Sequence, residues 1–170
     1  MFFLPFILLY LMFTYVLANI KNDDESMSDT INESAYVIVN RLAYEKHDPQ
    51  RGEIIVIEKD DIRYIRRIVG MPGDTIEFKK DSSDIVINSH VLSESYVVNN
   101  TVSSSDVTVT VPDDCYYVLG DNRDNSVDSR YWEEPFISKE DIVGKVLFSY
   151  SIWEFYIDFP PEINPEYLEF

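Results

Sequence analysis

An uncharged apolar stretch at the N-terminus constrains the fold of this 170-residue chain more than any other feature. Residues 1–20 contain no Asp, Glu, Lys or Arg, and Pro5, Thr14 and Asn19 are among the few interruptions. As one α-helix they would extend for roughly 30 Å, about the thickness of the hydrocarbon core of a bilayer. The alternatives fit less well, because a cleavable leader would begin with basic residues and a buried soluble helix would have a polar face. We therefore expect residues 1–20 to form a transmembrane anchor.

The charges that flank this stretch do not orient it in a membrane. Lys21 is the only cation close to its end, and Asp23, Asp24 and Glu25 follow almost directly. The positive-inside rule counts Lys and Arg near the ends of a span, so one lysine among acids favours neither side. One interpretation of the missing cations is that the protein starts further upstream.

The overall composition excludes several classes of function. The chain has 14 Lys and Arg against 31 Asp and Glu, a net charge of −17, and such a surface would repel nucleic acid. A single cysteine, Cys115, excludes an internal disulfide and a cysteine-based zinc site. With only His47 and His90, the sequence also predicts no histidine-rich metal site. Apolar residues make up 45% of the chain, which is enough for a folded core.

Beyond residue 20 the hydrophobic pattern is typical of β-strands. Short runs rich in β-branched and aromatic residues alternate with turn residues, and little helical periodicity is present. Strands are expected at 35–40, 53–58, 63–69, 75–78, 85–88, 107–111, 115–119 and 143–150. Pro72–Asp74 predicts a turn, and Ser138 with Asp141 predicts the start of a short helix. The fold class is therefore mainly β, with a folded domain at 21–153 and an irregular acidic, proline-containing tail at 154–170.

The segment Gly120–Arg130, GDNRDNSVDSR, carries the strongest functional signal. It follows an apolar strand directly and contains three Asp, two Asn, two Arg and two Ser. We expect a dense hydrogen-bonded turn in which guanidinium groups meet carboxylates. The ordered alternation of acids and bases distinguishes it from a generic polar loop, and from the residues alone a functional loop and a surface loop without function both stay open.

This segment resembles the C-terminal signature of type I signal peptidases. Two further segments match in the order and spacing of that family. Tyr64–Asp74 resembles the segment that normally holds a catalytic lysine, and Arg51–Val56 resembles the segment before it. Ser26 and Met27 stand where the nucleophile belongs, directly after the anchor.

The resemblance implies a membrane-anchored, mainly β catalytic domain that removes signal peptides from secreted precursor proteins. It implies a single-pass protein of the cell membrane with its domain on the extracytoplasmic face. The mechanism implied is a Ser/Lys dyad, in which a neutral lysine takes the proton of the attacking serine. Such a site needs no metal or organic cofactor, and the implied partners are precursor proteins and the lipid around the anchor.

The match is incomplete at the residues that would carry the chemistry. The resemblance makes Ser26 the nucleophile, but the position of the lysine falls on Arg66, and Asp29 replaces a proline of the nucleophile segment. A guanidinium stays protonated in proteins, so Arg66 cannot act as a general base. Asp24 is two residues before Ser26 and shares a face with it in an extended chain. We expect Asp24 to pair with Arg66, which favours a closed ion pair over a working base.

The surrounding family residues are better preserved. Ser126 corresponds to a serine that contacts the catalytic lysine, and Asp128 with Arg130 corresponds to a supporting ion pair. Met27 and Asp24 are candidates for the substrate groove. The full set of implied supporting residues is Arg67, Asp121, Asn122, Ser126, Asp128 and Arg130.

Two functions remain open from the sequence. The first is a signal peptidase I-like serine endopeptidase. The second is a catalytically inactive relative that binds precursor or pilin-like segments in surface-protein or pilus assembly. Edge strands of such a domain could hold an extended peptide by adding it to a sheet.

Overall fold

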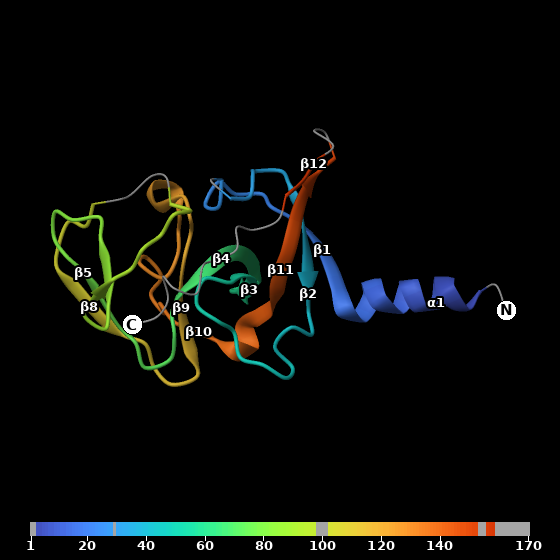
Figure 1. Ribbon diagram of the computed structural model, residues 1–170, viewed down its shortest axis with the longest axis horizontal. Helices are drawn as coiled ribbons and strands as arrows, with labels where there is room; N and C mark the ends of the chain where they lie inside the picture. Colours follow the sequence, from blue (N-terminus) through green and yellow to red (C-terminus); the bar gives the residue numbers. More distant parts are fainter. Residues whose placement is uncertain (1–2, 29, 98–101, 153–155, 159–170) are drawn as a thin grey trace.

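The structure is a computed structural model that describes residues 3–28, 30–97, 102–152 and 156–158. Within these residues the chain forms a short helical segment and two antiparallel β-sheets (Figure 1). The larger sheet has the order β1 (Leu17–Lys21), β2 (Tyr36–Asn40), β11 (Ile142–Ser151), β3 (Ile54–Lys59), β4 (Ile62–Gly70), β9 (Cys115–Leu119) and β10 (Ile137–Ser138), with β12 (Tyr156–Asp158) beside β11. The smaller sheet has the order β7 (His90–Val91), β6 (Ile85–Ile87), β5 (Thr75–Phe78) and β8 (Val107–Thr110).

Strand β3 lies at the centre of the larger sheet and is covered on both faces. Four apolar residues in succession, from Ile54 to Ile57, are all buried. Ile54 and Val56 join one core cluster, and Ile55 and Ile57 join another, because successive side chains of a strand point to opposite faces. This double burial explains why the sequence has a continuous apolar run here instead of an alternating one.

The strands expected from the sequence are confirmed as β2, β3, β4, β5, β6, β8, β9 and β11, so the mainly β fold class is confirmed. The turn at Pro72–Asp74 is closed by a backbone hydrogen bond from Asp74 to the Met71 carbonyl. A short 3-10 helix at Lys139–Asp141 begins with the expected cap between Ser138 and Asp141. Strands β7, β10 and β12 are only two or three residues long. They form because a partner strand lies beside them, since they are too short to carry a pattern of their own.

The helix at the N-terminus is shorter than the sequence predicts. Helix α1 spans Leu4–Leu11, and a π-helical turn continues it over Met12–Val16. The helical prediction is wrong for Leu17–Ile20, which lies in β1. The backbone of β1 pairs with β2, and Ala18 is buried in the core. These sheet contacts outweigh the helical continuation, since tertiary context overrides local preference.

Figure 1 shows α1 extending away from both sheets, and its Phe6 and Tyr10 side chains are exposed. In the part of the chain that the structure describes, no helix combines the length and the apolar character needed to cross a membrane. At the other end, the prediction of an irregular tail is wrong for Tyr156–Asp158, which pairs with β11. The rest of 154–170 lies outside the described residues.

Candidate active site

Ser26 lies in a tight turn that follows β1. The backbone N–H of Ser28 donates to the Glu25 carbonyl at 3.0 Å. The Asp24 carboxylate accepts the backbone N–H of Ser26 at 2.9 Å, which is the hydrogen bond of an Asx turn. Met27 is fully buried in the core. The buried Met27 side chain and the Asp24 carboxylate therefore fix the position of Ser26.

The Ser26 hydroxyl lies between a carboxylate and a guanidinium. Its Oγ donates to Oδ1 of Asp24 and accepts a hydrogen bond from Nη1 of Arg66. Nη1 of Arg66 also lies 3.2 Å from Oδ2 of Asp24, so the two oxygens of this carboxylate have different partners. Both Ser26 and Arg66 are 1% exposed, whereas the side chain of Asp24 is 43% exposed. The expected pairing of Asp24 with Arg66 is confirmed.

The Arg66 side chain comes from β4 and is held by backbone carbonyls as well. Its Nη1 donates to the Ile65 carbonyl at 2.7 Å, and its Nη2 donates to the Val127 carbonyl at 2.8 Å. These bonds fix the guanidinium against Ser26. Partial burial raises the pKa of the Asp24 carboxyl, but the charge of Arg66 and the hydrogen bonds from Ser26 outweigh this and lower it below its ordinary value.

Arg67 points to the opposite side of β4 and binds Asp121 through two hydrogen bonds. Nε of Arg67 lies 2.8 Å from Oδ1 of Asp121, and Nη2 lies 2.5 Å from Oδ2. Both side chains are 1% exposed. Thr30 donates its hydroxyl to the same carboxylate at 2.5 Å, which ties the segment after Ser26 to this pair. Thr30 is not among the site residues predicted from the sequence, because its partner is distant along the chain.

Asp128 gathers the polar groups of the Gly120–Arg130 segment. Its carboxylate accepts from Ser126 Oγ at 2.6 Å, from the Gly120 backbone N–H at 3.0 Å and from Nε of Arg130 at 2.9 Å. The predicted Asp128–Arg130 pair is therefore confirmed as a contact. The resemblance implied that Ser126 contacts the residue at the lysine position, Arg66. Its hydroxyl donates to Asp128 instead, and the carbonyl of the adjacent Val127 accepts the hydrogen bond from Arg66.

The same segment is hydrogen-bonded to the turn that contains Ser26. The backbone N–H of Asn122 donates to the Ser26 carbonyl at 2.9 Å, and its side-chain amide donates to the Glu25 carbonyl at 3.1 Å. Gly120 packs so closely that a Cβ there would lie 2.6 Å from the Ser26 carbonyl oxygen. Residues 120–130 and the turn at Ser26 therefore form one hydrogen-bonded unit. Asp29 lies outside the described residues.

A cleft of about 710 Å³ ends beside this unit. It lies between residues 19–24 on one side and residues 61–65 on the other. Strand β1 is at the edge of its sheet, and β4 pairs with β9 only from Arg67 onward, so within the described part of the chain both walls have strand edges without a partner strand. Asp24 lines the cleft, but Met27 does not, because its side chain is packed in the core.

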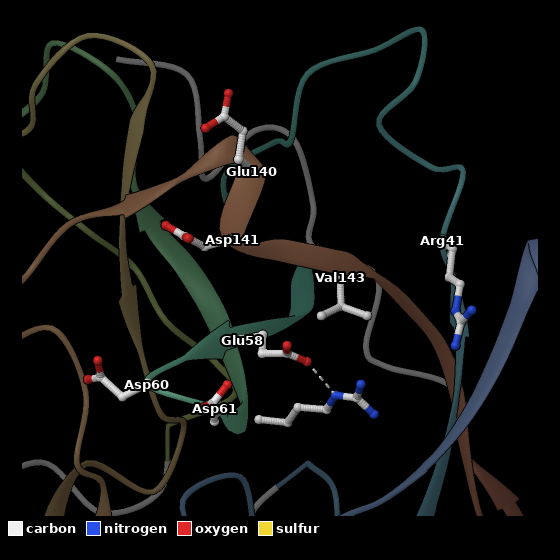
Figure 2. Close-up of a pocket in the computed structure, with 8 residues that line it drawn as sticks. Arg41, Glu58, Asp60, Asp61, Glu140, Asp141 and Val143 are labelled. Carbon is white, nitrogen blue, oxygen red and sulfur yellow. Dashed lines mark hydrogen bonds and ion pairs between the residues drawn. The ribbon is translucent and has the colours of Figure 1, made fainter.

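Figure 2 shows a second pocket, of about 660 Å³, at the tip of the β3–β4 hairpin and the start of β11. Five carboxylates surround it, and Glu58 is paired with Arg63 at 2.8 Å. The lining residues are Arg41, Glu58, Asp60, Asp61, Arg63, Glu140, Asp141 and Val143. None of the site residues expected from the sequence is among them, so the candidate active site is the Ser26 unit.

The protein is mainly β and has a buried serine beside a cleft bordered by strand edges. Comparison with known families identifies one family. The chain belongs to the family described as signal peptidase, peptidase S26, whose model matches residues 1–153. A signal peptidase I of Bacillus amyloliquefaciens is 37% identical over 127 residues, which cover 69% of this chain and 68% of that protein. Signal peptidase I P of Bacillus subtilis subsp. natto is 37% identical over 149 residues, which cover 81% of this chain and 79% of that protein. A crystal structure of a signal peptidase I from Enterococcus faecalis V583 aligns with 58% of this chain and 96% of the solved chain, at 34% identity and a TM-score of 0.48.

Proposed function

We propose that this protein is a signal peptidase that removes signal peptides from precursor proteins, with Ser26 as the nucleophile. One observation carries the proposal: in a chain of the signal peptidase family, the Ser26 hydroxyl is fixed beside a cleft and donates its proton to a carboxylate. A serine in that arrangement can attack a carbonyl carbon once the proton is taken.

The cleft supports an extended peptide as the substrate. Its walls are the outer edge of β1 and the first half of β4, and both have backbone groups without a strand partner among the described residues. An extended segment that enters the cleft gains main-chain hydrogen bonds by adding a strand. Its end nearest Asp24 is the end nearest Ser26, so the scissile bond would lie there.

Buried ion pairs and hydrogen bonds support the proposal that six residues position the nucleophile: Arg67, Asp121, Asn122, Ser126, Asp128 and Arg130. None of their contacts requires a substrate, and together they attach the turn at Ser26 to β4 and to residues 120–130. A nucleophile displaced by 1 Å loses much of its rate, so a rigid support has a direct catalytic value.

The family and the apolar N-terminus support a place at the membrane, with residues 1–16 in the bilayer and the β-domain on the extracytoplasmic face. The described side chains of α1 are apolar and largely exposed, which is unfavourable in water and favourable in lipid. Protease digestion of intact cells and of inverted vesicles tests this. Digestion of the domain in intact cells is the expected result, and protection there with digestion in inverted vesicles would contradict it.

Cleavage of a signal-peptide precursor by the full-length protein in detergent tests the function. We expect the native protein to release the signal peptide and Ser26→Ala to lose this activity completely. Ser93→Ala is the control, because Ser93 is exposed and outside the cleft. Equal cleavage by Ser26→Ala would contradict the nucleophile. Binding of precursor or pilin segments without cleavage by the native protein would instead favour the inactive relative that takes part in pilus or surface-protein assembly.

A further inference from the structure

The attack by Ser26 needs a proton acceptor, and Arg66 cannot be that acceptor. Among the described residues, every hydrogen bond of the Arg66 guanidinium is a donation, to Ser26, to Asp24 and to the carbonyls of Ile65 and Val127. A guanidinium has five N–H donors and no acceptor, and it stays protonated in proteins. The base must therefore be another group in contact with the Ser26 hydroxyl.

Asp24 is the carboxylate that contacts this hydroxyl in the described part of the chain. Its Oδ1 accepts from Ser26 Oγ, while Arg66 binds its other oxygen. Arg66 therefore orients the carboxylate and leaves one oxygen directed at the proton of Ser26, so the ion pair expected from the sequence in place of a working base does not occupy the oxygen that a base would use. Geometry of this kind, with a base bonded to the nucleophile and oriented by a third group, is the arrangement that activates a serine.

Asp24 also faces the place where the leaving group would be. A general base that accepts the serine proton must later return a proton to the departing amine, so it has to border the substrate as well as the nucleophile. Asp24 lines the cleft and its side chain is 43% exposed, whereas Ser26 and Arg66 are buried beneath it. Among the three residues only Asp24 meets both conditions.

We propose that Asp24 is the general base for Ser26 and that Arg66 is its positioning residue; this rests on the proposed peptidase function. Ser26 Oγ bonds to the scissile carbonyl carbon, its proton moves to Oδ1 of Asp24, and the carbonyl π electrons move to the carbonyl oxygen. When the carbonyl re-forms, the carbon–nitrogen bond breaks and the departing amine takes the proton from Asp24. Water then attacks the acyl-serine, gives a proton to Asp24, and Ser26 leaves with that proton.

The surroundings of Asp24 determine how the rate depends on pH. Arg66 is the cation in contact with it from β4, and the other charged groups along the cleft are Lys21, Asp23, Asp61 and Arg63. The base works only when ionised, and its lowered pKa keeps it ionised through neutral and mildly acidic pH. Activity is therefore retained as the pH falls and is lost only below the ordinary aspartate pKa of 3.8. A neutral lysine base would lose activity at a much higher pH.

Cleavage by Asp24→Asn and Asp24→Ala, in the full-length protein, tests the proposal. Asparagine keeps an oxygen for the Ser26 backbone N–H and removes the base, so we expect kcat to fall by about 100-fold or more. In Asp24→Ala, added formate and acetate should restore part of the rate, acetate more than formate because it is the stronger base. Asp113→Asn is the matched control, since Asp113 carries the same charge but is exposed and is not among the residues that line the cleft, and its rate should stay unchanged.

The possible results separate this proposal from the proposed function. If Asp24→Asn or Asp24→Ala cleaves as fast as the native protein, or faster, without added carboxylate, then Asp24 is not the general base. It would then only shield Ser26 from the cleft. A native rate no higher than that of Ser26→Ala would overturn the peptidase function and the base together. Melting curves of the variants identify any loss of fold, and in that event rescue by carboxylate and the acidic limb of the native pH profile decide the question.

Discussion

Two adjacent arginines on β4 have different partners because their side chains point to opposite faces of the strand. Arg66 reaches Ser26 and Asp24, while Arg67 forms a buried two-bond pair with Asp121. The guanidinium of Arg67 also lies 3.9 Å from the ring centroid of Tyr96, which adds a cation–π contact. Both arginines are fully buried, but of these two only Arg67 has an ion-pair partner that is equally buried.

Replacing Arg67 with Met should lower the free energy of unfolding by about 3–5 kcal/mol, because Asp121 would remain buried without its cation. Chemical denaturation measures the change. The double variant Arg67→Met/Asp121→Leu should recover part of the loss, since no buried charge is then left unpaired. Lys139→Met is the control, because the Lys139–Asp48 pair lies at the surface and its loss should leave stability unchanged. A stability of Arg67→Met equal to that of the native protein would contradict the role of this pair.

At the scale of elements, residues 120–130 and the turn at Ser26 form one unit although about a hundred residues separate them. The residues of this segment predicted the dense polar turn, and the family resemblance implied its internal Asp128–Arg130 pair. The sequence could not predict the bond between Asn122 and Ser26 or the close approach of Gly120, since the path of the whole sheet determines them. The roles of these residues in catalysis stay predictions.

Gly120→Ala tests this unit. The new methyl group would lie 2.6 Å from the Ser26 carbonyl oxygen, so the turn or the segment must shift. We expect the unfolding free energy to fall by about 1–3 kcal/mol, as in other overpacked sites, and cleavage to fall further because Ser26 moves. Gly73→Ala provides the comparison: it has open space around it but a φ of +82°, so it should lose stability through backbone strain and keep its cleavage rate. Equal cleavage by Gly120→Ala and the native protein would show that the contact does not position Ser26.

At the scale of the whole molecule, the sequence predicts the elements that carry a local pattern and misses those that depend on pairing with a distant strand. The long strands carry their own signal of β-branched residues between turns, and they were predicted with ends close to the observed ones. Strand β1 carries no such signal, because its apolar residues continue those of the helix before it. Only the presence of β2 makes the extended form of Leu17–Lys21 favourable. The boundary between helix and domain therefore falls at Val16 and Leu17, not after Ile20.

Two truncated forms test that boundary. A protein that begins at Leu17 keeps β1, the burial of Ala18 and the cleft wall at 19–24, so its β-domain should melt like that of the full-length protein. One that begins at Asn22 loses five residues paired with β2, and we expect its unfolding free energy to fall by more than about 2 kcal/mol, from lost burial and lost backbone hydrogen bonds. Hydrogen exchange should be faster in β2 of the shorter form, because β2 then becomes the edge of the sheet. Equal stability of the two forms would mean that Leu17–Lys21 does not contribute to the stability of the β-domain, and that the stabilising part of the sheet begins at β2.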